Sequence, residues 1–103
     1  MPLRTKTEIA TELDSLRYEI DKVETDIEKV GWEIQEVMAK RMAAESIMSG
    51  SFEQDQKDMA QQQHQEFCTQ LVDLCQKQDY RNREMQDLKR RETRLSRQWQ
   101  SAN

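Results

Sequence analysis

Residues 9–37 read IATELDSLRYEIDKVETDIEKVGWEIQEV. Apolar residues recur in this stretch at alternating spacings of four and three, at Ile9, Leu13, Leu16, Ile20, Val23, Ile27, Val30, Ile34 and Val37. This is the heptad pattern of a coiled coil, with apolar side chains at positions a and d. Because a helix with such a stripe needs another helix to cover it, the stretch predicts an all-α fold.

The first helix is predicted over residues 6–48. Thr5 and Glu8 form a capping box, in which side-chain oxygens accept hydrogen bonds from free amides at the start of a helix. The segment Ser49-Gly50-Ser51 is the one break in the pattern, and Gly50 suits the left-handed conformation that ends many helices. The sequence therefore predicts a loop over residues 49–51.

A second helix is predicted over residues 52–99, with Ser51 and Gln54 as its capping box. It carries its own heptad stripe, formed by Ala60, His64, Phe67, Leu71, Leu74, Gln78, Arg81, Met85, Leu88, Glu92, Leu95 and Trp99. A short loop makes consecutive helices antiparallel neighbours. We therefore predict a single domain over residues 1–103, a coiled-coil-like antiparallel helical hairpin that dimerises into a four-helix bundle.

One continuous helix through Gly50, dimerising in parallel, is the competing architecture. It would stack Arg41 on Arg41 and Glu92 on Glu92 between two chains, and like charges in a buried stripe are costly. The hairpin avoids both clashes and is therefore the favoured prediction.

Folding the chain about the predicted loop pairs residues whose numbers add to about 101. This register sets Leu13 opposite Leu88, but it sets three apolar residues opposite polar ones. These pairs are Val23 with Gln78, Ile20 with Arg81 and Ile9 with Glu92. The stems of the long polar side chains could cover these positions. We favour the alternative, in which Ile9, Ile20 and Val23 form part of a protein interface.

A second apolar arc flanks the stripe on one side of the hairpin. The first helix contributes Trp32, Met38 and Met42 to it, and the second contributes Cys68, Val72 and Cys75. One-sided apolar surface is typical of an interface. The predicted occupant is a second copy of the hairpin or a helix of another protein, as in a larger helical complex.

The composition limits the class of protein. Charged residues make up 35% of the 103 residues and aromatic residues 6%, with two glycines and one proline. So few turn-forming residues argue against a β-rich fold. The abundance of Glu, Lys, Gln and Arg is typical of coiled coils.

Neither a membrane-spanning segment nor a signal peptide is expected. The chain has no run of about 18 apolar residues, and residues 1–6 lack the apolar core of a signal peptide. Cys68 and Cys75 are separated by about 10 Å of helix rise, which is too far for a disulfide. We therefore expect reduced thiols, a cytoplasmic chain and no membrane insertion.

Four arginines raise the possibility of nucleic-acid contact. Arg83, Arg90 and Arg97 repeat every seven residues, and Arg94 lies among them. Such a stripe could contact phosphates. A solvated helix surface is the favoured interpretation, because the net charge is −4 and no nucleic-acid-binding motif is present.

No catalytic, cofactor or metal site is predicted, and no small-molecule substrate. His64 is the only histidine and is expected to form a polar layer in the stripe. Cys68 follows it at i+4, but Cys75 is two turns further on and no fourth metal ligand is nearby. The cysteines are expected to act as small packing residues rather than as redox sensors.

These features predict a small adaptor or assembly subunit that binds other helices and is not an enzyme. The architecture resembles that of cytosolic export chaperones and stalk-like subunits of secretion machines, which are also small helical hairpins. No family motif accompanies this resemblance. The alternatives are a purely structural homo-oligomer and a nucleic-acid accessory that uses the arginine stripe.

Overall fold

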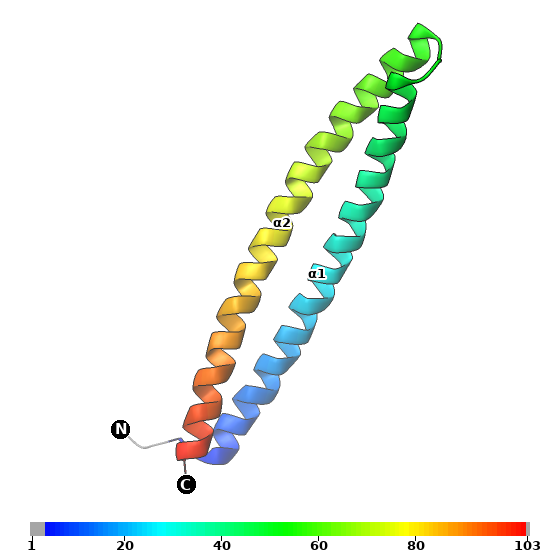
Figure 1. Cartoon of the computed structure of the whole chain (residues 1–103). Coiled ribbons are helices and arrows are strands. Elements are labelled where there is room, and N and C mark those ends of the chain that lie inside the picture. The colour runs from blue at the N-terminus through cyan, green and yellow to red at the C-terminus, as the bar shows by residue number, and fades with distance from the viewer. Residues whose placement is uncertain (1–3, 103) are drawn as a thin grey trace. The chain divides into compact units, whose positions relative to one another are not determined.

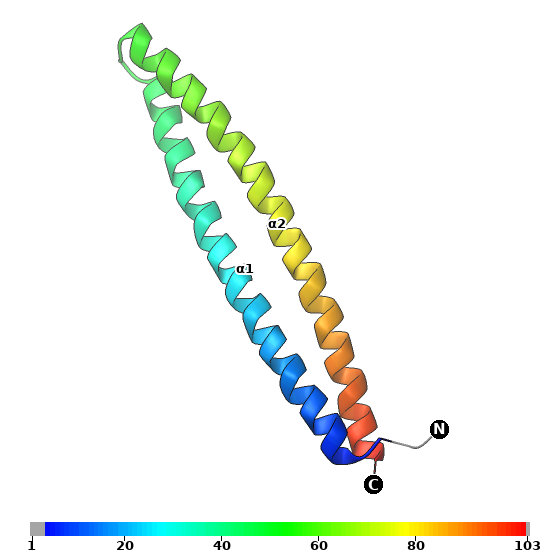
Figure 2. The same cartoon turned by 180° about the vertical axis from the view of Figure 1, so that it is seen from behind.

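The structure, a computed structural model, describes residues 4–102 and consists of two helices (Figure 1). Helix α1 spans Lys6–Ser49 and helix α2 spans Gln54–Ser101. The helices run in opposite directions, as the reverse view also shows (Figure 2). This confirms the predicted all-α antiparallel hairpin and excludes one helix through Gly50. The first three residues of the N-terminal stretch searched for a signal peptide lie outside the described residues.

The hairpin divides into two compact units, each formed by a piece of α1 and a piece of α2. The terminal unit comprises Met1–Ile27 and Tyr80–Asn103, and the loop unit comprises Glu28–Asp79.

The start of α1 is capped as the sequence predicts. The Glu8 amide donates a hydrogen bond to the Thr5 hydroxyl at 3.2 Å, and the Ile9 amide donates to the Thr5 carbonyl at 3.1 Å. Thr5 is therefore the N-cap, and the predicted first residue of the helix, Lys6, is confirmed.

The start of α2 differs from the prediction by two residues. The helix begins at Gln54, and the Lys57 amide donates to the Glu53 carbonyl at 3.0 Å. Ser51 is therefore not the N-cap. The side chain of Gln54 instead donates to the Asp58 carboxylate at 2.8 Å. Because α1 ends at Ser49 and α2 begins at Gln54, the linker between the helices is residues 50–53.

Gly50 is required for a reason other than the predicted one. Its φ angle is not positive, so the left-handed cap is wrong. A Cβ atom at this position would lie 2.9 Å from the Ser46 carbonyl oxygen and 2.9 Å from Cε2 of Phe52. Glycine allows the ring of Phe52 and the last turn of α1 to approach the backbone closely.

The buried residues are all members of the two predicted stripes. On α1 they are Ile9, Leu13, Leu16, Ile20, Val23, Val30, Val37 and Ala44, and on α2 they are Ala60, Leu71 and Leu88. The heptad pattern thus identified the buried face of each helix.

The register between the helices differs from the prediction. In the terminal unit, Leu88 packs in one cluster with Leu16, Ile20 and Val23, whereas the prediction set it opposite Leu13. The ion pair Arg17–Glu92, at 3.5 Å, joins residues whose numbers add to 109 rather than to about 101. The register is thus displaced by about one heptad. Such a shift keeps a positions against d positions, and the longer linker accommodates it.

The displaced register overturns the prediction that Ile9, Ile20 and Val23 are left uncovered by α2. Their exposed fractions are 1%, 8% and 5%, so the hairpin itself buries them. Ile20 and Val23 belong to the cluster with Leu16 and Leu88, and Met85, Leu95 and Ile27 pack against that cluster. Ile9, Ile20 and Val23 therefore belong to the core of the terminal unit and form no part of an exposed surface.

Arg81 shows how a polar side chain fits into this stripe. Its Nε atom is buried and has no hydrogen-bond partner among the described residues. Its terminal nitrogens reach Glu84 at 2.8 Å and Asp26 at 3.6 Å. The hydrogen bond to Glu84, aided by the charges of Glu84 and Asp26, raises the pKa of the Arg81 guanidinium. The stem thus covers apolar surface while the charge remains at the edge.

Candidate protein-interaction surface

The loop unit exposes large apolar side chains on both of its helices. Trp32 is 72% exposed, Met42 60%, Val72 56% and Met38 40%. Cys75 is also exposed, and Cys68 is half-buried. These six residues, Trp32, Met38, Met42, Cys68, Val72 and Cys75, are called the docking surface below.

The heptad positions of these residues explain why the hairpin leaves them exposed. Met38, Cys68 and Cys75 lie at e, Met42 and Val72 at b, and Trp32 at f. These positions are contiguous on a helix and adjoin the stripe without being part of it. In an antiparallel pair the two e flanks lie on the same side, so both helices contribute to one surface of the loop unit.

Gly31 adjoins Trp32 in the middle of α1, and nothing within the chain requires a glycine there. Its φ angle is not positive, and a Cβ atom would meet no heavy atom within 4 Å. A glycine inside a helix costs about 1 kcal/mol relative to alanine. Its lack of a side chain leaves space beside Trp32 in which another backbone could approach α1 closely.

The two units carry different charges. The loop unit has ten acidic and five basic side chains, a net charge of −5. The terminal unit has ten acidic and eleven basic side chains, a net charge of +1. The docking surface therefore lies in the acidic part of the chain.

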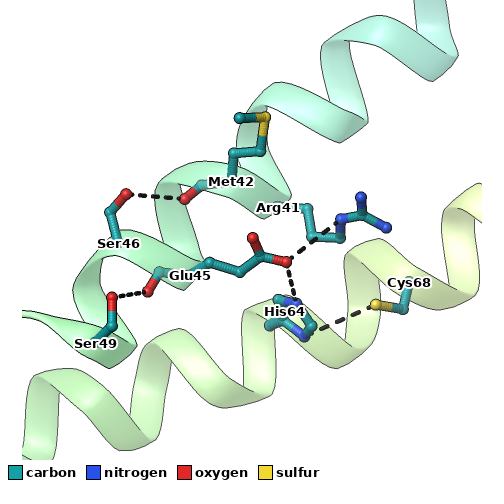
Figure 3. A network of polar contacts seen from close by, with 7 residues as sticks. All are labelled: Arg41, Met42, Glu45, Ser46, Ser49, His64 and Cys68. Carbon is teal, nitrogen blue, oxygen red and sulfur yellow. Dashed lines mark hydrogen bonds and ion pairs between the residues drawn. The ribbon is translucent and has the colours of Figure 1, made fainter.

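A polar cluster joins the helices within the loop unit (Figure 3). His64 Nε2 lies 3.0 Å from a carboxylate oxygen of Glu45, and Arg41 Nε lies 3.7 Å from the same oxygen. On the other side of the imidazole ring, His64 Nδ1 lies 3.8 Å from the Cys68 sulfur. His64 is thus a polar member of the stripe, as predicted, and it has partners on both sides.

The sequence alone did not identify Glu45 as the partner of His64. The predicted register set His64 opposite Val37, because it was displaced by about one heptad. Glu45 occupies an e position beside the stripe, and several other glutamates have similar positions. No local signal distinguished it from them.

Comparison of the chain with protein-family models, with curated proteins and with solved structures finds no match. Its function is therefore inferred from its own geometry.

The predicted arginine stripe lies on α2 in the terminal unit, where Arg83, Arg90, Arg94 and Arg97 are all exposed. Arg90 pairs with Asp87 on its own helix at 3.7 Å. Arg94 also borders a shallow hollow that is lined from α1 by Glu12 and Glu19. Acidic side chains thus offset part of the positive charge of this stripe.

Other exposed apolar residues of the loop unit were not singled out by the sequence. Phe52 and Met59 are 48% and 63% exposed. Phe52 was expected to be the first residue of α2 and lies in the linker instead. Met59 immediately precedes the buried Ala60. Its heptad position outside the stripe was therefore the signal from which its exposure could have been predicted.

Within residues 4–102, no three His, Cys, Asp or Glu side chains gather in a way that could hold a metal ion. In the same part of the chain, neither helix has a segment that combines the length and the apolar character needed to cross a membrane.

Proposed function

We propose that this chain is a non-enzymatic protein–protein interaction module, an adaptor or assembly subunit, that binds a basic amphipathic helix of a partner protein. The binding site is the docking surface of the loop unit. The observation that carries the proposal is the exposure of Trp32 together with Met42 and Val72. Tryptophan offers a large apolar area and is enriched among residues that dominate binding energy.

The chemistry of the partner follows from the shape and charge of this unit. A helix that docks on an apolar surface presents residues at spacings of three and four on one face. The net charge of −5 on the loop unit favours lysines or arginines along the edges of that helix. The space beside Gly31 would allow the docked helix to approach α1 closely.

A second copy of the chain is the competing occupant, and it would give the four-helix bundle of a homo-oligomer. Isologous contact through the docking surface would set two loop units of charge −5 side by side. Like charges across an interface oppose association, so a basic partner fits this surface better. The proposal places the complex in the cytoplasm, where free thiols such as those of Cys68 and Cys75 remain reduced.

Photo-cross-linking in the native host tests the proposal. A photoreactive residue replaces Trp32 in one variant and Tyr18, an exposed aromatic residue of the terminal unit, in a matched control. The expected result is a cross-link at position 32 alone, to a basic amphipathic helix of another protein. Equal cross-linking at both positions would contradict the proposal. Cross-links to a second copy alone would favour the homo-oligomer, and light scattering would then show a stable dimer.

The purified partner then allows a quantitative test. Trp32→Ala is expected to weaken binding by about 2 kcal/mol, or roughly thirtyfold. Tyr18→Ala removes an equally exposed aromatic side chain outside the docking surface and should leave the affinity unchanged. An equal loss in both variants would argue against a site on the loop unit.

A further inference from the structure

The polar cluster of the loop unit places a thiol, an imidazole and a carboxylate in a row. Cys68 and His64 lie one turn apart on α2, and Glu45 approaches the ring of His64 from α1 (Figure 3). Arg41, one turn before Glu45, lies within ion-pair distance of the same carboxylate oxygen. These are the charged and titratable groups that contact the imidazole and its carboxylate partner.

The hydrogen-bond chemistry fixes the position of the proton on a neutral His64. A carboxylate only accepts hydrogen bonds, so the imidazole nitrogen that faces Glu45, Nε2, must be the donor. The other nitrogen, Nδ1, then carries a lone pair, and it is the atom that faces the Cys68 sulfur at 3.8 Å. In this tautomer the thiol of Cys68 can donate to Nδ1, and the contact with Glu45 orients the ring. A nucleophile, a base and a group that orients the base form the recurring arrangement of an activated nucleophile.

Cys75 provides a matched reference within the same helix. It lies seven residues after Cys68, at the same heptad position, and is more exposed. His64 is the only histidine of the chain, so Cys75 has no imidazole base of its own. Accessibility alone would make Cys75 the faster thiol, whereas a neighbouring base would favour Cys68.

We propose that Cys68 is a thiol-modification site that reacts with small disulfides, with His64 as general base and Glu45 as its positioning residue. The thiol proton moves to His64 Nδ1, and the Cys68 sulfur attacks one sulfur of the disulfide. A new S–S bond joins Cys68 to half of the reagent, and the other half leaves as a thiolate. Cys68 is oxidised and the leaving half is reduced, as in any thiol–disulfide exchange. Cys68 is also part of the docking surface, but this inference rests on its contact with His64 and not on the proposed docking function.

Two single-thiol proteins test the proposal with an uncharged dipyridyl disulfide, whose released thione is followed by absorbance. Cys75→Ser leaves only Cys68, and Cys68→Ser leaves only Cys75. Cys68 is expected to react at least about tenfold faster at neutral pH, since general-base assistance commonly exceeds this factor. An equal or faster rate for the more exposed Cys75 would overturn the proposal.

Replacement of the base separates its action from accessibility. His64→Gln in the Cys75→Ser protein should lower the rate of Cys68 to that of Cys75 or below it. The same replacement in the Cys68→Ser protein should leave the rate of Cys75 unchanged. An unaltered Cys68 rate in a folded His64→Gln protein, as judged by circular dichroism, would exclude His64 as the base. If this variant fails to fold, the comparison of the two thiols in the presence of His64 still decides the proposal.

The role of Glu45 requires a graded test. Glu45→Gln should slow Cys68 by about threefold or more, a fraction of the effect of the base itself, and Glu45→Asp should restore part of the rate because it keeps the carboxylate. Glu36→Gln is the control, since Glu36 is an exposed carboxylate of the same helix that pairs with Lys40. Equal effects of Glu45→Gln and Glu36→Gln would remove Glu45 from the proposal.

Discussion

The terminal unit and the loop unit are built from the same two helices, yet they use their apolar residues differently. In the terminal unit, Leu16, Ile20, Val23 and Leu88 pack into one buried cluster. In the loop unit, Trp32, Met42 and Val72 are exposed beside the stripe. The first unit packs stripe residues into one buried cluster, and the second exposes several large apolar side chains beside its stripe.

The terminal unit reverses one part of what the sequence suggested. The predicted register placed good apolar partners near the loop and left the beginning of α1 uncovered. In the structure, Ile9 is among the most deeply buried residues, whereas Trp32, Met42 and Val72 are exposed, as their positions beside the stripe predicted. A single displacement of about one heptad changes which residues meet, although each helix buries the face that was predicted.

Matched leucine truncations provide the strongest test of this contrast. Leu88→Ala should destabilise the protein by about 3 kcal/mol, because it leaves a cavity in the buried cluster. Leu71→Ala, at a similarly buried site of the loop unit, should cost less, about 2 kcal/mol, because fewer buried apolar groups surround it. Urea denaturation measures both. A larger loss for Leu71→Ala would show that the loop unit holds the main core.

Gly50→Ala is expected to produce the next largest effect. The added Cβ would press against the Ser46 carbonyl oxygen and the Phe52 ring, and such overpacking costs about 1–3 kcal/mol. Thermal denaturation measures the loss. Gly50→Ala combined with Phe52→Ala should recover part of it, since one of the two clashes is then removed. Wild-type stability in the single variant would contradict the close approach.

Gly31→Ala should have the opposite sign. A Cβ at this position meets open space, so alanine should stabilise α1 by up to about 1 kcal/mol through its helix propensity. Thermal denaturation of the isolated chain measures the gain, and binding to the purified partner should weaken at the same time. A loss of stability would show that Gly31 has a packing role within the hairpin.

The smallest expected effect concerns the ion pair that joins the helices of the terminal unit. Glu92→Gln removes the partner of Arg17 and should cost about 0.2–1 kcal/mol at low salt. At about 1 M salt the difference should vanish through screening. Asp87→Asn, which removes a carboxylate paired only within α2, is the control. A loss that persists at high salt would mean that Glu92 contributes packing as well as charge.

The sequence by itself determined the helices and their buried faces. Heptad spacing, the Thr5 cap and the break near Gly50 are local properties, because each depends on residues within a few turns of one another. The exposure of Trp32 and Met42 followed in the same way from their positions beside the stripe. All of these features could be predicted without knowledge of the partner helix.

Only the tertiary structure decided the register and everything that depends on it. A displacement of one heptad leaves every a position facing a d position, so the apolar pattern cannot distinguish the two alignments. The linker of residues 50–53 and the packing of individual side chains select one of them. That choice buries Ile20 beside Leu88 and sets Glu45 against His64, because contacts between residues distant in the sequence depend on the alignment of the whole helices.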